Sequence, residues 1–213
     1  MHDHAYSDPD RAAVHRVIAQ RRDMRHFIGG VVDDDVLVRL LTAAHHAPSV
    51  GLMQPWRFIR VTDPGLRVAI HGLVEVERER TAEALGERSD EFMRLKVEGV
   101  LECAELLVVA LGDDRERHVF GRRTMPQMDL ASAACAIQNL WLAARAEGLG
   151  MGWVSLFEPD DLRRLLGMPA GSEPVAVLCL GPVEEFYDRP MLEETGWVVA
   201  RPLTDLVSVN GWA

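Results

Sequence analysis

The chain has 213 residues, of which 48% are apolar, and this composition excludes a disordered chain and provides enough apolar side chains for one core. Acidic residues outnumber basic ones by 33 to 23, and the resulting net charge of −10 argues against a general nucleic-acid-binding protein. The chain has no apolar run long enough to span a bilayer, and its polar start lacks the apolar core of a secretory signal, so we expect a cytoplasmic protein that does not bind membranes.

The first predicted helix starts at Ser7, whose side chain can cap it, and has Pro9 in its first turn. The stretch Arg-Arg-Asp-Met-Arg-His-Phe, residues 21–27, directly follows this helix. Arginine side chains are planar forks suited to gripping a phosphate. The acid among them, Asp23, is not needed for that grip and suggests a second task. The alternative is a solvated cluster whose charges neutralise one another.

A second helix is predicted from residues 33–35, and Pro48 ends it. The next stretch, residues 47–56, contains two prolines and a glycine, so we predict an irregular loop of the kind that often carries function. The alternation over residues 57–62 predicts a short strand.

Two heavily charged helices are predicted over residues 66–85 and 91–105, with an interruption over residues 86–90. Such a pair has few apolar side chains to bury. We therefore predict an excursion from the core at about residues 75–100, which is either a lid or an ordinary surface hairpin.

Residues 106–111 form a continuous apolar run that predicts a strand buried on both faces. Residues 127–147 form the most apolar predicted helix. Because apolar residues occupy nearly its whole circumference, we expect it to be buried, with a subunit interface as one means of burial.

The glycines at positions 148, 150 and 152 follow a helix and lead into a predicted strand over residues 153–157, whereas a dinucleotide-binding fingerprint follows a strand and opens a helix. We therefore assign Gly148 as a helix stop and predict no Rossmann site. A short helix over residues 160–166, a buried strand over 174–180 and a long tail over 187–213 complete one α+β domain, residues 1–213, of helices around a small sheet.

Several chemistries are excluded because their motifs are missing. The chain has no Gly-x-Ser-x-Gly elbow and no His-Glu-x-x-His, and the adjacent His45 and His46 do not share a helix face, so we predict no metal site. Cys103, Cys135 and Cys179 form no Cys-x-x-Cys pair and are predicted to be buried thiols in a reducing compartment.

What remains is anion binding beside large apolar surfaces. The candidates for holding a phosphate are Arg21, Arg25 and Arg201. The candidates for the polar edge of a heterocycle are hydroxyl and amide side chains: Ser49, Gln54 and Ser155. Those for its apolar wall are Leu52, Met53 and Trp56. A phosphorylated, flat ligand such as flavin mononucleotide (FMN) fits this set.

Four segments resemble the nitroreductase superfamily of FMN proteins: residues 21–27, Ala-Pro-Ser-Val-Gly-Leu-Met-Gln-Pro-Trp at 47–56, Gly-Met-Gly-Trp-Val-Ser at 150–155 and Arg-Pro-Leu at 201–203. The resemblance extends from about residue 14 to residue 207. It implies a nitroreductase-like α+β fold with a small central mixed sheet surrounded by helices. It also implies a homodimer with flavin sites at the subunit interface and a C-terminal extension that packs on the partner subunit.

At two positions the sequence departs from the ordinary family pattern, and at both it resembles one branch of the superfamily. Asp23 stands where the usual pattern has serine, and Leu52 stands where it has an asparagine that contacts the flavin. The branch with these features consumes reduced FMN and molecular oxygen to make 5,6-dimethylbenzimidazole, the lower ligand of vitamin B12. The resemblance therefore implies FMN as substrate, oxygen as co-substrate, no metal, and a separate flavin reductase that supplies reduced FMN.

The resemblance also implies residue roles. Asp23 and Ser155 would be catalytic and lie near the flavin, the phosphate would be held by Arg21, Arg25 and Arg201, and the charged excursion would be a lid. The full set of expected FMN-binding residues is Arg21, Arg22, Asp23, Met24, Arg25, Ser49, Gly51, Leu52, Gln54, Ser155 and Arg201.

Other roles stay open at this point. Asp23 can instead pair with Arg22 or Arg25, and Ser155 can make a structural hydrogen bond to a neighbouring loop. The protein can also be an NAD(P)H-dependent FMN nitroreductase or a flavin-binding protein without catalytic activity.

Overall fold

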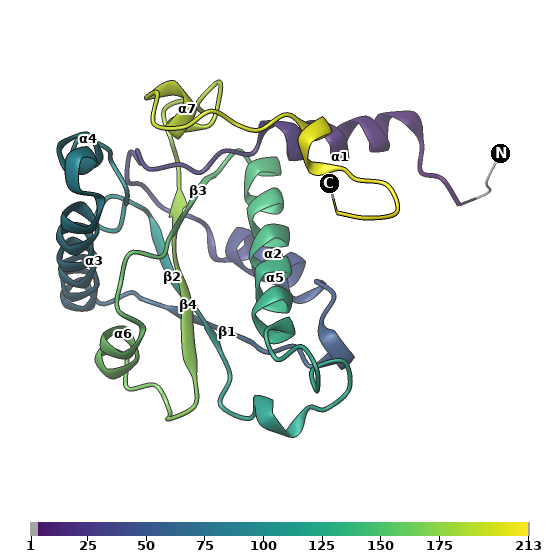
Figure 1. Ribbon diagram of the computed structural model, residues 1–213, viewed down its shortest axis with the longest axis horizontal. Coiled ribbons are helices and arrows are strands. Elements are labelled where there is room, and N and C mark those ends of the chain that lie inside the picture. Colours follow the sequence, from purple (N-terminus) through teal and green to yellow (C-terminus); the bar gives the residue numbers. More distant parts are fainter. Residues whose placement is uncertain (1–3, 213) are drawn as a thin grey trace.

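The computed structural model describes residues 4–212, and Figure 1 shows the arrangement of its elements. The α-helices are α1 Asp8–Gln20, α2 Asp34–His45, α3 Pro64–Leu85, α4 Ser89–Met93, α5 Met128–Ala146, α6 Pro159–Leu165 and α7 Met191–Glu194. The strands are β1 Trp56–Arg60, β2 Glu105–Leu111, β3 Gly150–Val154 and β4 Glu173–Gly181. The predicted α+β class is therefore confirmed.

The four strands form one sheet in the order β1-β2-β4-β3, and all three pairings are antiparallel. The prediction of a mixed sheet was wrong for these strands. A parallel contact is made by a single bridge, in which Asp23 pairs with Met151 at the outer edge of β3. The segment that follows α1 thus extends the sheet by one bridge.

Helices cover both faces of the sheet, with α2 and α5 on one side and α3 and α6 on the other (Figure 1). Side chains of β2 alternate between the two cores, so that Leu107 and Val109 pack under α5 while Leu106 and Val108 pack under α3. Every residue of β2 is buried, as its continuous apolar run predicted.

The helix predicted over residues 91–105 is present only up to Met93, where α4 ends, and the chain is irregular from there to residue 104. A contact distant in sequence explains the difference. Gly99 lies directly over the segment after α1, where a Cβ atom would come within 2.6 Å of the Phe27 ring and 2.9 Å of the Arg25 carbonyl oxygen. A regular helix would place its own backbone and side chains there.

The strand predicted over residues 153–157 instead begins at Gly150 and ends at Val154, so Ser155 lies just past its end. Glycines at positions 150 and 152 are needed because a Cβ at Gly152 would lie 2.2 Å from the Met24 carbonyl oxygen. Two other sequence signals are confirmed: Ser7 caps α1 by accepting from the Asp10 amide, and Gly148, with φ of +78°, follows the end of α5.

Some apolar side chains lack cover in the single chain. Within the single chain, α5 is buried only on the side that faces the sheet, since Leu130 is 43% exposed and Cys135 is exposed on the opposite side. The prediction of three buried thiols therefore holds for two of them. Full burial of α5 at a subunit interface stays a prediction. No residue of α1 is buried, and the C-terminal tail exposes Leu203, Leu206, Val207 and Val209. Over residues 4–212, no helix combines the length and apolar character needed to cross a membrane.

The close approach of residue 24 to β3 predicts opposite effects for two glycine substitutions. Gly152→Ala should lower the free energy of unfolding by about 1–3 kcal/mol, because the new methyl group overlaps the Met24 carbonyl. Gly72→Ala, on the exposed side of α3 with nothing within 4 Å, should raise it by about 0.5–1 kcal/mol. Urea denaturation measures both. Wild-type stability of Gly152→Ala would show that residue 24 does not pack against β3.

Candidate functional site

A cavity of about 610 Å³ opens between the segment after α1, the end of β3, helices α3 and α4, and the tail around α7. Its polar end carries the side chains of Arg21, Arg22, Asp23, Arg25 and Ser155. The rest of the lining is mostly apolar, with Leu85, Phe92, Leu95, Val97, Met191 and Trp197 beside the polar Thr81 and Glu193. A site that is cationic at one end and apolar at the other suits an anionic ligand with a flat apolar body.

Asp23 is held from behind by two contacts with its neighbours. Arg25 Nη2 donates to Asp23 Oδ2 at 2.7 Å and to the Trp153 carbonyl oxygen at 2.8 Å, while the Trp153 amide donates to Asp23 Oδ1 at 3.0 Å. The Arg25 side chain is only 11% exposed, whereas that of Asp23 is 43% exposed, toward the cavity. The carboxylate is therefore fixed in direction and still presented to a ligand.

Burial raises the pKa of the Asp23 carboxyl above its ordinary value, and this effect outweighs Arg25, the Trp153 amide and Arg21, which each lower the pKa. The carboxyl consequently holds a proton more readily than an exposed aspartate does. A group of this kind can give or take a proton at the floor of the cavity.

The arginines differ in what they already contact. Arg22 donates to the carbonyl oxygens of Ala19, Arg21 and Asp188, so its guanidinium ties the end of α1 to the tail. Arg21 instead lies over the Trp141 ring, 4.6 Å from its centroid. Arg21 is thus the arginine of this group whose guanidinium is least committed to protein acceptors.

Two of the three buried donors that lack an acceptor in the described part of the chain belong to arginines that line the cavity, and the third is Arg78 Nε. Within residues 4–212, Arg25 Nη1 and Arg22 Nε are buried and have no hydrogen-bond partner. A buried donor without an acceptor is destabilising, and a ligand with ring or phosphate oxygens would satisfy it. The Ser155 hydroxyl also lines the cavity, and it makes no hydrogen bond to any residue that the structure describes.

Six of the predicted site residues do not line this cavity. Met24 is fully buried in the core, and its amide donates to the Met151 carbonyl. Arg201 lies on the exposed tail next to Ala200, which does line the cavity, and donates to the Asp205 carbonyl oxygen. The other four belong to the loop after α2: Ser49, Gly51, Leu52 and Gln54.

That loop lies at the opposite end of α5 from the cavity. The Val50 amide donates to Ser132 Oγ near the start of α5, whereas Trp141 near its end donates to the Arg22 carbonyl oxygen. Nine residues of helix separate these contacts by about 14 Å. Leu52, with a positive φ of 52°, is 78% exposed. One chain therefore carries the predicted site residues in two separate groups.

The apolar wall of the cavity was missed by sequence reasoning, and its central contact is made by Trp197 of the tail. Trp197 packs on Phe92, with ring centroids 6.2 Å apart, and the Arg88 guanidinium lies 3.5 Å from the Trp197 centroid. These residues are separated by about a hundred positions, so no local pattern could bring them together.

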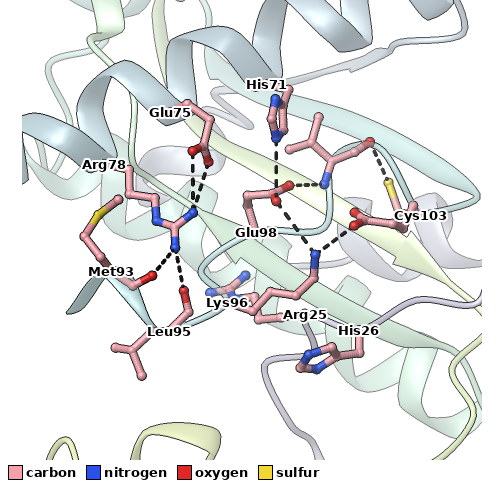
Figure 2. Close-up of polar contacts among 12 residues, drawn as sticks. Arg25, His26, His71, Glu75, Arg78, Met93, Leu95, Lys96, Glu98 and Cys103 are labelled. Carbon is pink, nitrogen blue, oxygen red and sulfur yellow. Dashed lines mark hydrogen bonds and ion pairs between the residues drawn. The ribbon is translucent and has the colours of Figure 1, made fainter. Parts of the chain in front are cut away.

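Hydrogen bonds and ion pairs connect the segment with Leu95, which lines the cavity, to α3 (Figure 2). Arg78 Nη2 donates to the carbonyl oxygens of Met93 and Leu95, at 2.7 and 3.0 Å. Behind it, His71, Glu75 and Glu98 bring their ligand atoms within 4.8 Å of one another. Arg78 and Lys96 already lie 3.4 and 3.9 Å from these carboxylates, so the cluster is neutralised by protein cations.

Comparison with known proteins supplies the family context. The sequence model described as the nitroreductase family matches residues 18–182. A 5,6-dimethylbenzimidazole synthase from Rhodospirillum rubrum is 42% identical over 184 residues, which cover 85% of this chain and 87% of that protein. One from Rhodobacter capsulatus is 39% identical over 90% of this chain and 94% of its own. A BluB-like flavoprotein from Clostridium difficile has the same fold, with a TM-score of 0.71 at 17% identity, and covers 93% of this chain and 99% of its own.

The raised pKa of Asp23 predicts a pH-dependent effect of Asp23→Asn. Because the folded state binds the Asp23 proton more tightly than the unfolded state does, the stability from this group is complete at low pH and is lost as pH rises through the folded pKa. The unfolding free energy of Asp23→Asn relative to the wild type should therefore rise between about pH 4 and about pH 7. Urea titrations at both pH values test this, with Asp160→Asn as the control for loss of one negative charge. A difference independent of pH would contradict it.

Proposed function

Because this chain belongs to the nitroreductase family, we propose that it is a 5,6-dimethylbenzimidazole synthase, which fragments reduced FMN with molecular oxygen to give the lower ligand of vitamin B12. The relatives with that name span nearly the whole chain. The observation that carries the proposal is the Asp23 carboxyl, held by Arg25 and the Trp153 amide and presented to a cavity with an apolar wall.

The cavity suits FMN in charge, shape and unsatisfied donors. Arg21 provides a guanidinium for the phosphate, the buried Arg25 Nη1 provides a donor for a ring oxygen, and the Phe92 and Leu95 side chains provide apolar cover for the ring system. When bound, reduced FMN supplies the electrons for oxygen reduction and is itself the molecule that is cleaved.

The protein contributes proton handling and the exclusion of water. The carboxyl of Asp23, with its raised pKa, gives or takes a proton at the cleaved part of the substrate. The Ser155 hydroxyl, which also lines the cavity, orients the flavin ring system. The α3–α4 region acts as a lid, with Leu95 and Val97 facing the cavity and the Arg78 network fixing their backbone. Reduced FMN comes from a separate flavin reductase.

We propose further that a homodimer completes the site. The exposed face of α5 places apolar and small side chains, including Leu130 and Ala131, where a second copy can pack. Antiparallel packing along α5 would bring the loop with Ser49, Gly51, Leu52 and Gln54 from one chain beside the cavity of the other. The tail, with Arg201 and its exposed apolar residues, would then pack on the partner subunit.

Product analysis tests the activity. Purified protein is mixed with excess reduced FMN in air, and the mixture is analysed by liquid chromatography with mass detection. Formation of 5,6-dimethylbenzimidazole with matching loss of flavin is expected. Full recovery of FMN with only hydrogen peroxide formed would overturn the proposal. NAD(P)H oxidation with quinone or nitroaromatic acceptors would then identify a nitroreductase, and its absence a flavin-binding protein.

Asp23→Asn should retain FMN binding and lose at least about a hundredfold in product formation, because the amide keeps the shape but cannot transfer the proton. Fluorescence quenching of FMN measures binding, and chromatography measures product. Asp160→Asn, which removes a carboxylate on α6 outside the cavity, should behave as the wild type. A normal rate in Asp23→Asn would remove this carboxyl from the mechanism.

Arg21→Ala should weaken FMN binding roughly 10- to 100-fold, the equivalent of about 1.5–3 kcal/mol for a charged hydrogen bond, and should leave riboflavin binding nearly unchanged. Isothermal titration with both flavins measures this difference. Arg80→Ala, an exposed arginine outside the cavity, is the matched control. An equal loss for both flavins would show that Arg21 does not contact the phosphate.

Leu130→Glu should give a folded monomer with strongly reduced FMN affinity, because a buried charge disfavours packing along α5 and half of the proposed site then moves away. Light scattering after size-exclusion chromatography reports the mass, and fluorescence titration reports FMN affinity. Val68→Glu places the same charge at an exposed apolar position of α3 and should change neither. A dimeric Leu130→Glu protein would exclude α5 as the interface.

A further inference from the structure

Two of the three cysteines lie together in the core under α3, although they are 76 positions apart in the sequence. Cys179 is on β4 and pairs in register with Leu106 of β2, so Cys103, three residues before Leu106, lies just past the same end of β2. Both side chains belong to the same buried core cluster, and the Cys103 thiol donates to the Val100 carbonyl oxygen. Both cysteines are free thiols.

A hollow of about 450 Å³, separate from the 610 Å³ cavity beside Asp23 (called the flavin cavity below), borders one of the two cysteines. Cys103 lines it together with Gly30, Thr62, Pro64, Arg67, Leu101, Ala104 and Glu105. Cys179 is completely buried and does not line it. Of the two cysteines, only Cys103, which is 3% exposed, borders this hollow.

The surroundings make the two thiols chemically unequal. Arg67 donates to the carbonyl oxygens of Cys103 and Ala104, which fixes the Cys103 backbone and places a positive charge nearby. The neighbouring Cys179 and the charge of Arg67 lower the pKa of Cys103 against the opposing effect of its burial, while the neighbouring Cys103 and complete burial raise the pKa of Cys179. Cys103 is therefore the stronger candidate for a reactive thiolate, and Cys179 stays a thiol.

We propose that Cys103 and Cys179 form a peroxide-sensitive redox site that closes to a disulfide. The Cys103 thiolate attacks one oxygen of hydrogen peroxide, the O–O bond breaks, and the products are a sulfenic acid and hydroxide. The Cys179 sulfur then attacks the Cys103 sulfur, and the departing hydroxide takes up the Cys179 proton as water. Two thiols and one hydrogen peroxide thus give one disulfide and two waters. This site does not depend on the proposed flavin chemistry.

A disulfide here would act on the wall of the flavin cavity. Cys103 lies near the end of the irregular segment 94–104, which begins beside the cavity with Leu95 and Val97 and crosses Phe27 at Gly99. Cys103 Sγ donates to the Val100 carbonyl oxygen at 3.6 Å in the reduced state (Figure 2). Oxidation would replace this contact with a covalent link to β4 and restrict the segment.

The test uses the full-length Cys135→Ser protein, which removes the exposed thiol and keeps both core cysteines. The protein is treated with hydrogen peroxide, denatured, alkylated with N-ethylmaleimide and weighed by intact-mass spectrometry. Expected are two labels before oxidation, none after it, and two again after reduction by a phosphine. Digestion without reduction should yield one cross-linked peptide that contains Cys103 and Cys179. Retention of both labels would overturn the proposal, as would loss of both without recovery on reduction.

Two further variants in the same background assign the roles. With Cys179→Ser, Cys103 should be trapped by dimedone as a sulfenic acid after the same exposure. With Cys103→Ser, Cys179 should keep its label, because it does not line the hollow. Circular dichroism checks that each variant is folded, and the parent protein already decides whether the disulfide forms. Equal oxidation of the two single-thiol proteins would contradict the order of attack.

Discussion

The contact between the segment after α1 and the outer edge of β3 is the constraint on which the candidate site depends. The Asp23 carboxylate accepts a hydrogen bond from the Trp153 amide, and Arg25 donates one to the Trp153 carbonyl oxygen. Between these two residues, the Met24 amide donates to the Met151 carbonyl oxygen. Backbone and side-chain hydrogen bonds thus act on the same three positions. They bury an arginine and leave a carboxylate facing outward, which neither residue would do in an unconstrained loop.

Glycine makes this contact possible, and the same contact determines the cavity. Because Gly152 has no side chain, the Met24 backbone can lie against β3, while Gly150 leaves room for the side chains of Met24 and Val183. Phe27, three residues after Met24, then contacts Gly99. The irregular segment 94–104 follows from that second approach. Its position allows Leu95 and Val97 to form a wall opposite Asp23.

Sequence patterns predicted the parts of this molecule that depend on local chemistry. The apolar runs of β2 and β4, the cap at Ser7 and the stop at Gly148 all lie where expected. The segment after Met93 and the start of β3 were missed, because their conformations depend on residues about 70 to 130 positions away. In the candidate site, the fold places residues of the 21–25 motif and Ser155 around one cavity, as the sequence predicted. The loop at residues 49–54 does not reach this cavity within one chain, because it lies at the other end of α5.

The bridge at β3 also affects how copies of this protein can meet. An edge strand with unpaired backbone groups can add a strand from another molecule and so begin aggregation. Residues 23–25 occupy the outer edge of β3, and the opposite edge strand, β1, has only five residues and includes Arg57 and Arg60. Both borders of the sheet are therefore poor templates for strand addition. The proposed dimer accordingly uses a helical surface, where side-chain shape and not backbone pairing selects the partner.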